Sequence, residues 1–127
     1  MPHLIIEYTD NLSSHIQVKE LLKKSGQVLS SFPDVYPIGG IRARAIKVTD
    51  YYIADGSEDD AFVHMTLKIG AGRTDKEKKD TCDKLFQTLQ DHLQDLYQSR
   101  YLALSLELYE FSELGTYKKN NIHKRFK

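Results

Sequence analysis

Residues 61–77, AFVHMTLKIGAGRTDKE, combine a strand pattern, a glycine turn and the start of a helix in one short stretch. Residues 61–69 alternate between aliphatic and mostly polar side chains, which predicts a β-strand with one face directed at a core. A Gly-Ala-Gly turn at 70–72 follows, and Thr74 with Glu77 forms the S/T-x-x-E pattern of a capping box. This stretch therefore predicts a strand that leads through a tight turn into a helix.

Downstream of this stretch, apolar residues recur every three or four positions, as on one side of a helix. The stripe consists of Cys82, Leu85, Phe86, Leu89, Leu93, Leu96 and Tyr97. It predicts one long amphipathic helix that begins after Thr74. A further strand is expected over residues 102–111, where every second residue from 102 to 108 is leucine. Together these elements form a β-α-β unit, in which the two strands are parallel.

The first half of the chain repeats this order. Residues 3–8 and 41–48 are expected to form strands, and Ser14 with Gln17 has the spacing of a capping box between them. Apolar residues then follow at helical spacing: Val18, Leu21, Leu22, Val28 and Leu29. Two β-α-β units with right-handed crossovers predict an α+β fold of the α/β-repeat type, a four-stranded sheet with two helices on one face.

A chain of 127 residues is one domain of ordinary size. We expect a single domain over residues 1–127, with similar halves at about 2–58 and 59–114 and a polar arm at about 115–127. The arm is either a frayed tail or a segment that orders against a neighbouring subunit. Because two helices cover only one side of the sheet, and the other side carries a mixed set of side chains, we expect a homo-oligomer.

Composition excludes several classes of partner. Lysine plus arginine equals aspartate plus glutamate at 18 each, so no net charge attracts nucleic acid or an anionic membrane. The sequence shows no membrane span and no signal peptide, and we expect a cytoplasmic protein. The single cysteine, Cys82, excludes an internal disulfide and makes a thiolate metal cluster implausible. Its apolar helical position indicates a buried structural thiol.

Familiar cofactor motifs are absent from the sequence. There is no P-loop, dinucleotide or zinc signature, and the G-x-G at residues 70–72 lacks the third glycine of a Rossmann turn. The histidines are not at metal-ligand spacing, so we expect neither a metal nor a cofactor. What remains is Pro2, Arg42 and Arg44 on one face of a strand, and Arg73 beside a helix N-terminus, where anions bind favourably. The alternative to a functional site is that Pro2 only begins a strand and that the arginines are ordinary surface charges.

These residues and several short segments carry a resemblance. Pro2 at the start of a strand, GIRAR at 40–44, FVHMTLKIGAGR at 62–73 and NNIH at 120–123 together resemble the 5-carboxymethyl-2-hydroxymuconate Δ-isomerase family of the tautomerase superfamily. The resemblance extends from Pro2 to the C-terminus, and residues 62–73 are a specific block within it. It implies a homotrimer and an unsaturated carboxylate substrate from homoprotocatechuate (4-hydroxyphenylacetate) catabolism.

The resemblance also implies a mechanism without a cofactor. Removal of Met1 exposes the secondary amine of Pro2, which similar enzymes use as a general base. Nearby arginines lower the pKa of that amine and hold the substrate's carboxylates. The implied catalytic residue is Pro2, and Arg42 and Arg73 are the implied carboxylate ligands. Further candidates for substrate binding are Arg44, Phe62 and His64, although His64 could equally be a strand residue satisfied by a neighbour.

Two other functions stay open at this point. The chain could be a tautomerase of a smaller oxo-acid or of a phenylpyruvate-like enol, which a panel of substrates would distinguish. It could also be a non-catalytic binding or signalling protein on the same scaffold. The state of the N-terminus separates this last reading from catalysis, because a Pro2 nitrogen in an amide bond is not a base.

Overall fold

The computed structural model describes residues 1–126, so Lys127, the last residue of the predicted arm and domain, lies outside the described residues. Its four strands form one sheet in the order β2-β1-β3-β4. The two pairs β1/β2 and β3/β4 are parallel, and the central pair β1/β3 is antiparallel. The predicted parallel pairing within each half is therefore confirmed, with these strand bounds: β1 His3–Thr9, β2 Arg42–Val48, β3 Ala61–Gly70 and β4 Leu102–Phe111.

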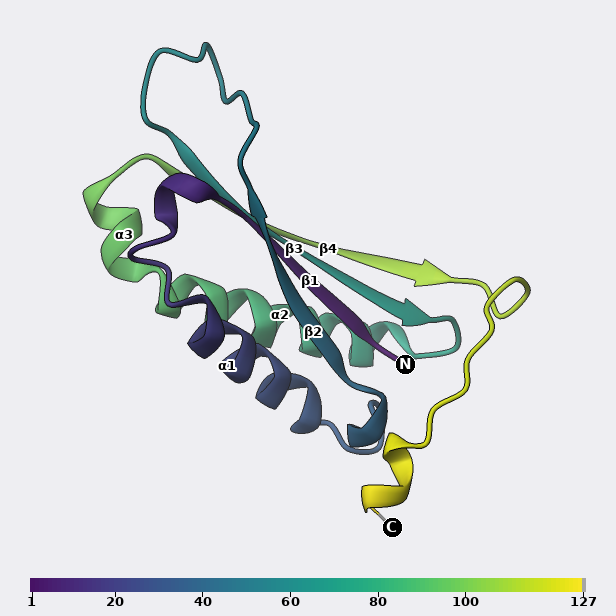
Figure 1. Ribbon diagram of the computed structural model, residues 1–127. Helices are drawn as coiled ribbons and strands as arrows, with labels where there is room; N and C mark the ends of the chain where they lie inside the picture. The colour runs from purple at the N-terminus through teal and green to yellow at the C-terminus, as the bar shows by residue number, and fades with distance from the viewer. Residues whose placement is uncertain (127) are drawn as a thin grey trace.

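The helices lie on one face of the sheet, as Figure 1 shows. They are α1 (Val18–Ser30), α2 (Asp75–His92) and the short α3 (Gln94–Ser99). Three 3₁₀ turns complete the chain: η1 Asp10–Leu12, η2 Ile38–Gly40 and η3 Ile122–Phe126. The α+β architecture predicted for this chain is confirmed. None of the helices within residues 1–126 is long and apolar enough to cross a membrane.

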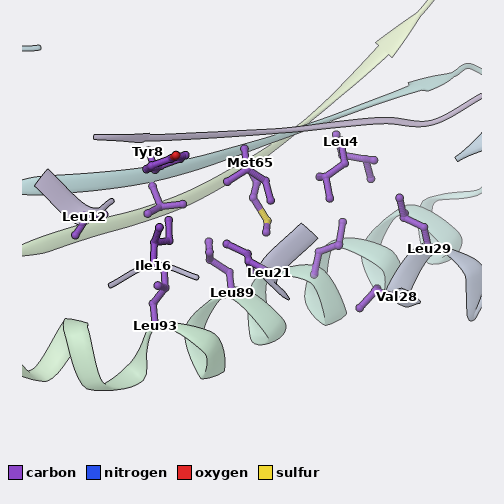
Figure 2. Close-up of a cluster of buried hydrophobic side chains, with 14 of the residues drawn as sticks. Leu4, Tyr8, Leu12, Ile16, Leu21, Val28, Leu29, Met65, Leu89 and Leu93 are labelled. Atoms are coloured by element: carbon purple, nitrogen blue, oxygen red, sulfur yellow. The ribbon is translucent and has the colours of Figure 1, made fainter. Parts of the chain in front are cut away.

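The core lies between the sheet and the helices (Figure 2). Alternate residues of β1 and β3 face it, and α1 and α2 close it from the other side, because apolar side chains at strand and helix periods fall on one face of each element. The fully buried side chains include Leu4, Ile6, Leu21, Leu29, Val63, Met65, Leu67, Leu85 and Leu89.

The predicted capping box at Ser14 and Gln17 is wrong. Helix α1 begins at Val18, and Gln17 precedes it with a left-handed backbone (φ 50°) and no side-chain cap. The cause is tertiary packing, because Leu12 and Ile16 are both buried and the Ile16 amide bonds the Leu12 carbonyl at 2.9 Å. This buried turn fixes the entry to α1 in place of a side-chain cap.

The single long helix predicted after Thr74 is also wrong, because it is divided at Leu93. Leu93 is buried but leaves helical geometry (φ −107°, ψ 15°), and α3 starts immediately after it. At the end of α2, the His92 Nε2 donates to the Ile16 carbonyl at 2.7 Å and ties this point to the chain before α1. Tyr97, predicted on the apolar stripe, is 58% exposed. Cys82 is half-buried, and burial raises the pKa of its thiol.

The capping box at the start of α2 is confirmed, and it provides a stability prediction. The Thr74 hydroxyl accepts from the Glu77 amide at 3.1 Å, and the Glu77 carboxylate accepts from the Thr74 amide at 2.8 Å. We expect Thr74→Ala to lower the free energy of unfolding by about 1 kcal/mol, measured by urea denaturation. Ser14→Ala is the matched control and should change it by less than about 0.5 kcal/mol. Equal effects of the two substitutions would contradict the assignment of the caps.

The open face of the sheet is the side away from the helices, and it carries a mixed set of side chains. The strand registers place on it His3, Ile5, Glu7, Arg42, Arg44, His64, Thr66 and Glu107. No element within residues 1–126 covers these side chains as α1 and α2 cover the other face (Figure 1). Self-association through this face stays a prediction.

The C-terminal arm docks on its own chain. After β4 the chain runs back past the N-terminus and ends in η3 beside η2, as the yellow segment in Figure 1 shows. The Asn120 side-chain amide donates to the Gly39 carbonyl at 2.8 Å. Within the described residues the arm is thus not a frayed tail, because it is ordered against η2 of the same chain; a contact of the arm with a neighbouring subunit stays a prediction.

Candidate active site

A cavity of about 420 Å³ opens at the N-terminal end of β1. Its lining comes from four parts of the chain: the N-terminus, the loop before β2, the turn between β3 and α2, and the C-terminal arm. The lining residues are Met1, Pro2, Pro37, Gly40, Arg73, Lys118, Asn120 and His123. The structure therefore brings together two of the residues singled out in the sequence, Pro2 and Arg73.

The sheet topology explains this convergence. Parallel pairing places the starts of β1 and β2 at one end, where the Arg42 amide donates to the Pro2 carbonyl at 3.2 Å. Antiparallel pairing of β1 with β3 brings the end of β3 to the same place, with His3 opposite Lys68. Arg73 follows three residues after β3 ends at Gly70. Pro2, Arg42 and Arg73 are thus neighbours because β1 and β2 start, and β3 finishes, at the same end of the sheet.

The guanidinium of Arg73 is held in position by main-chain carbonyls. Its Nε and Nη2 donate to the Val35 carbonyl at 3.3 and 2.9 Å, and its Nη1 donates to the Gly70 carbonyl at 3.1 Å. The group also lies over the Tyr36 ring, 4.9 Å from the centroid. Arginine has five N–H donors, so two stay available, and no ion pair within residues 1–126 uses them. A fixed, unpaired guanidinium of this kind suits a carboxylate ligand.

The electrostatic environment at this end of the sheet disfavours a charged amine. The pKa of the Met1 amino group is lowered, first by burial and then by the positive charges of Lys118, Arg73 and Arg42. Both causes act in the same direction, because burial and nearby cations each raise the free energy of an ammonium ion. An amine at this position is therefore held toward its neutral, basic form.

Arg42 and Arg44 lie on the open face and do not line the cavity. Arg42 is opposite His3 in the β1/β2 register, next to Pro2. Arg44 is two residues further along β2, opposite Ile5, and its Nη1 donates to the His3 Nδ1 at 3.3 Å. Burial lowers the pKa of His3, and Arg44 and Arg42 lower it further. Arg42 is thus close enough to act on an amine at Pro2, whereas Arg44 faces His3.

Phe62 and His64 lie away from Pro2 in the single chain. Because β3 runs antiparallel to β1, these residues are at the opposite end of the sheet, some five to seven residues along β1 from Pro2. At roughly 3.3 Å per residue this is about 17–23 Å. Phe62 packs edge-on against Tyr51 with ring centroids 6.4 Å apart. His64 bonds the Ser105 hydroxyl at 2.6 Å and the Glu107 carboxylate at 3.1 Å.

Two larger hollows, of about 620 and 630 Å³, lie beside the start of β4. The first contains Arg100, but this guanidinium is already paired with Asp59 at 3.2 Å. Glu58 and Asp60 line the same hollow and would repel a carboxylate. The second hollow has Asp91 as its one charged lining residue. Neither suits an anionic ligand as the cavity at Pro2 does.

The sequence reasoning missed the arm residues of the cavity: Lys118, Asn120 and His123. One signal was available in the Gly39-Gly40 pair, which permits a close approach of backbone to the arm. A Cβ atom on Gly39 would lie 2.7 Å from the His123 Nδ1 and 2.8 Å from the His123 Cα. The NNIH segment at 120–123 was part of the resemblance, but no local pattern shows where such a segment docks.

Comparison with known proteins is consistent with this geometry. The family model described as 5-carboxymethyl-2-hydroxymuconate isomerase matches residues 2–126. A 5-carboxymethyl-2-hydroxymuconate Delta-isomerase from Escherichia coli is 39% identical over 127 residues, with all of both chains covered.

Solved structures show the same similarity. The crystal structure of a 5-carboxymethyl-2-hydroxymuconate isomerase from Deinococcus radiodurans R1 is 54% identical, with a TM-score of 0.96 over 99% of this chain and 94% of that one. A fused 4-OT described as a symmetric trimer has a TM-score of 0.69 at 18% identity, over 92% of this chain and 93% of that one. At this identity the last similarity shows a shared fold alone.

Proposed function

This chain belongs to the 5-carboxymethyl-2-hydroxymuconate isomerase family, and we propose that it uses the Pro2 nitrogen as a general base to move a proton along an unsaturated polycarboxylate. The substrate we propose is 5-carboxymethyl-2-hydroxymuconate or a close analogue. The observation that carries this proposal is the position of Pro2, in one cavity with a fixed arginine that has no carboxylate partner within residues 1–126.

Basicity at Pro2 requires the removal of Met1. An amide nitrogen has no basic lone pair, whereas a free prolyl nitrogen is a secondary amine. An ordinary α-amino group has a pKa of about 8 and is mostly protonated at neutral pH. A guanidinium about 6 Å away lowers such a pKa by roughly two units at an effective dielectric constant of about 20. The lowered pKa of the amino group at Met1 supports the same effect on Pro2 in this cavity.

The reaction then needs one proton carrier and fixed cations. Pro2 accepts the proton of the dienol hydroxyl and returns it to a carbon elsewhere in the conjugated system. Arg73 and Arg42 bind substrate carboxylates and stabilise the dienolate-like charge of the transition state. The donors of Arg73 are preorganised by the Val35 and Gly70 carbonyls, so little reorganisation is required when charge develops. No step in this scheme requires a cofactor.

We propose a homotrimer, in which the open face of the sheet is covered by neighbouring copies. Phe62 and His64 would then take part in catalysis only across a subunit boundary, since a single chain holds them at the far end of the sheet from Pro2. Arg44 points to the same open face beside His3. Arg42 and Arg73 are the main proposed substrate-binding residues, and these three are proposed to add further contacts to the substrate in the assembly.

Light scattering on the purified protein should give about three times the chain mass of 14.7 kDa. Ile5 lies on the open face at the centre of the sheet, opposite Arg44 and Thr66 in register. Ile5→Asp places a charge in the proposed interface and should shift the mass toward that of the single chain at micromolar concentration. A stable monomer of the unsubstituted protein would contradict the trimer.

A panel of three substrates tests the proposed function. We expect kcat/KM to be highest for 5-carboxymethyl-2-hydroxymuconate, lower for 2-hydroxymuconate and lowest for enol-phenylpyruvate, because the cavity presents several cations. Absorbance of the conjugated dienol follows each reaction. Highest activity on phenylpyruvate would overturn the substrate assignment, and no activity on any of them would indicate a binding protein on this scaffold.

A further inference from the structure

The C-terminal arm is fastened to the structure at the edge of the Pro2 cavity. The Asn120 side chain donates to the Gly39 carbonyl at 2.8 Å and accepts from the Ile122 amide at 2.8 Å. The Lys124 amide bonds the Asn121 carbonyl at 3.1 Å and closes the turn that starts η3. One side chain thus joins the arm to η2 and also fixes the local conformation of the arm.

Close packing supports this attachment. The space that a Cβ on Gly39 would need is filled by His123 backbone and ring atoms, at 2.7–2.9 Å. A Cβ atom on Gly40 would lie 3.4 Å from the Met1 Cγ and 3.6 Å from the His123 Cε1. The arm, η2 and the N-terminus therefore meet at one place, and η2 continues directly into β2, which carries Arg42.

Lys118 is brought to the cavity by this attachment. It lies two residues before Asn120 and lines the cavity together with Pro2 and Arg73. It forms no ion pair within residues 1–126. Among the cations that lower the pKa of the Met1 amino group, Lys118 acts most strongly, ahead of Arg73 and Arg42. An unpaired ammonium group beside an unpaired guanidinium forms a site for more than one carboxylate.

We infer that the arm delivers Lys118 to the Pro2 cavity as a third carboxylate-binding cation, beside Arg73 within the cavity and Arg42 next to Pro2 on the open face, an inference that rests on the proposed isomerase function. The three cations match the charge of the substrate, since 5-carboxymethyl-2-hydroxymuconate has two terminal carboxylates and a third on its carboxymethyl group. A lysine ammonium on a flexible stem binds a carboxylate without the strict geometry of a guanidinium. Lys118 is therefore a specificity-determining residue for the tricarboxylate.

The first experiment compares substrates with three and two carboxylates. Lys118→Met should lower kcat/KM for 5-carboxymethyl-2-hydroxymuconate about tenfold, mainly through KM, and should lower it less than about threefold for 2-hydroxymuconate. Lys118→Arg should restore most of the difference because it keeps the charge. Lys119→Met is the matched control: it removes the adjacent exposed lysine, which does not line the cavity, and should leave both values unchanged.

The second experiment needs no isomerase activity. Cyanate carbamylates only the unprotonated amine, so the pH dependence of Pro2 carbamylation, followed by mass spectrometry, reports the pKa of Pro2. Lys118→Met should raise the midpoint by about half a pH unit, a modest shift because the lysine is exposed and screened. Lys119→Met should leave it unchanged.

The outcomes separate this inference from the proposed function. If Lys118→Met matches the unsubstituted protein in substrate preference and carbamylation midpoint, or if Lys119→Met changes both equally, the role of Lys118 is overturned while the isomerase stands. If the unsubstituted protein fails to isomerise any dienol, the proposed function fails. A shift of the carbamylation midpoint specific to Lys118→Met would then still support its placement beside Pro2.

Discussion

A chain that keeps a residue attached to the Pro2 nitrogen is expected to lose isomerase activity by at least about 1,000-fold, within the contribution of a positioned general base. Such a chain is obtained by inserting a leucine between Met1 and Pro2, because its bulk prevents removal of the methionine. The nitrogen then stays in an amide bond and cannot accept a proton. The rate of dienol conversion, with intact mass to verify the N-terminus, measures the effect.

The control for this change is Pro2→Ala, which still presents an amine after removal of Met1. Because a primary amine differs in basicity and geometry, its loss should be smaller than that of the blocked chain, about tenfold to a thousandfold. Both chains should keep the oligomeric state and thermal unfolding of the unsubstituted protein. Full activity in the chain with the blocked nitrogen would show that Pro2 serves only to begin β1.

Arg73→Ala is expected to lower kcat/KM for multiply carboxylated dienols by roughly 30- to 1,000-fold, or about 2–4 kcal/mol of transition-state binding. The guanidinium is fixed by the Val35 and Gly70 carbonyls and by the Tyr36 ring, so its two remaining donors have a defined direction. Its removal takes away a carboxylate ligand and one of the charges that keep Pro2 neutral.

Three comparisons separate this catalytic role from loss of structure. Arg73→Lys keeps the charge without the paired donors, and it should recover only part of the activity. Arg42→Ala should also weaken catalysis, since Arg42 adjoins Pro2. Lys19→Ala removes an exposed charge on α1 and should have no effect. If Arg73→Ala and Arg42→Ala both keep the kcat/KM of the unsubstituted protein while folding normally, the assignment of carboxylate ligands is wrong.

Local sequence patterns predicted the helices and strands correctly wherever contacts between neighbours in the sequence decide the conformation. The strand over residues 61–69 and the Thr74 cap were correct, because alternation and the capping box involve neighbours in sequence. The cap at Ser14 failed because burial of Ile16 fixes the chain before α1, and burial of that kind depends on distant residues. The break at Leu93 was missed because the apolar period continues unchanged through it.

The candidate site likewise contains some residues whose position the sequence predicts and others whose position it does not. The meeting of Pro2 and Arg73 follows from strand order, of which the sequence predicted the parallel pairing within each β-α-β unit but not the antiparallel pairing of β1 with β3. Lys118 had no such signal, because its place depends on the contact of Asn120 with Gly39 across 81 residues of sequence. Phe62 belongs to the same specific block as Arg73, yet the length of β3 separates the two residues within one chain.

The proline base is tested most directly by the pH dependence of kcat/KM in protein whose intact mass shows that Met1 is absent. This parameter follows the free enzyme, so its acidic limb reports the pKa of the Pro2 amine. A base must be deprotonated to act, and burial and the neighbouring cations lower the pKa of an amine in this cavity. We therefore predict that kcat/KM rises with pH and reaches its plateau with a midpoint below pH 7. A midpoint at or above the value of about 8 for an ordinary α-amino group, or full activity with Met1 still attached, would contradict the account.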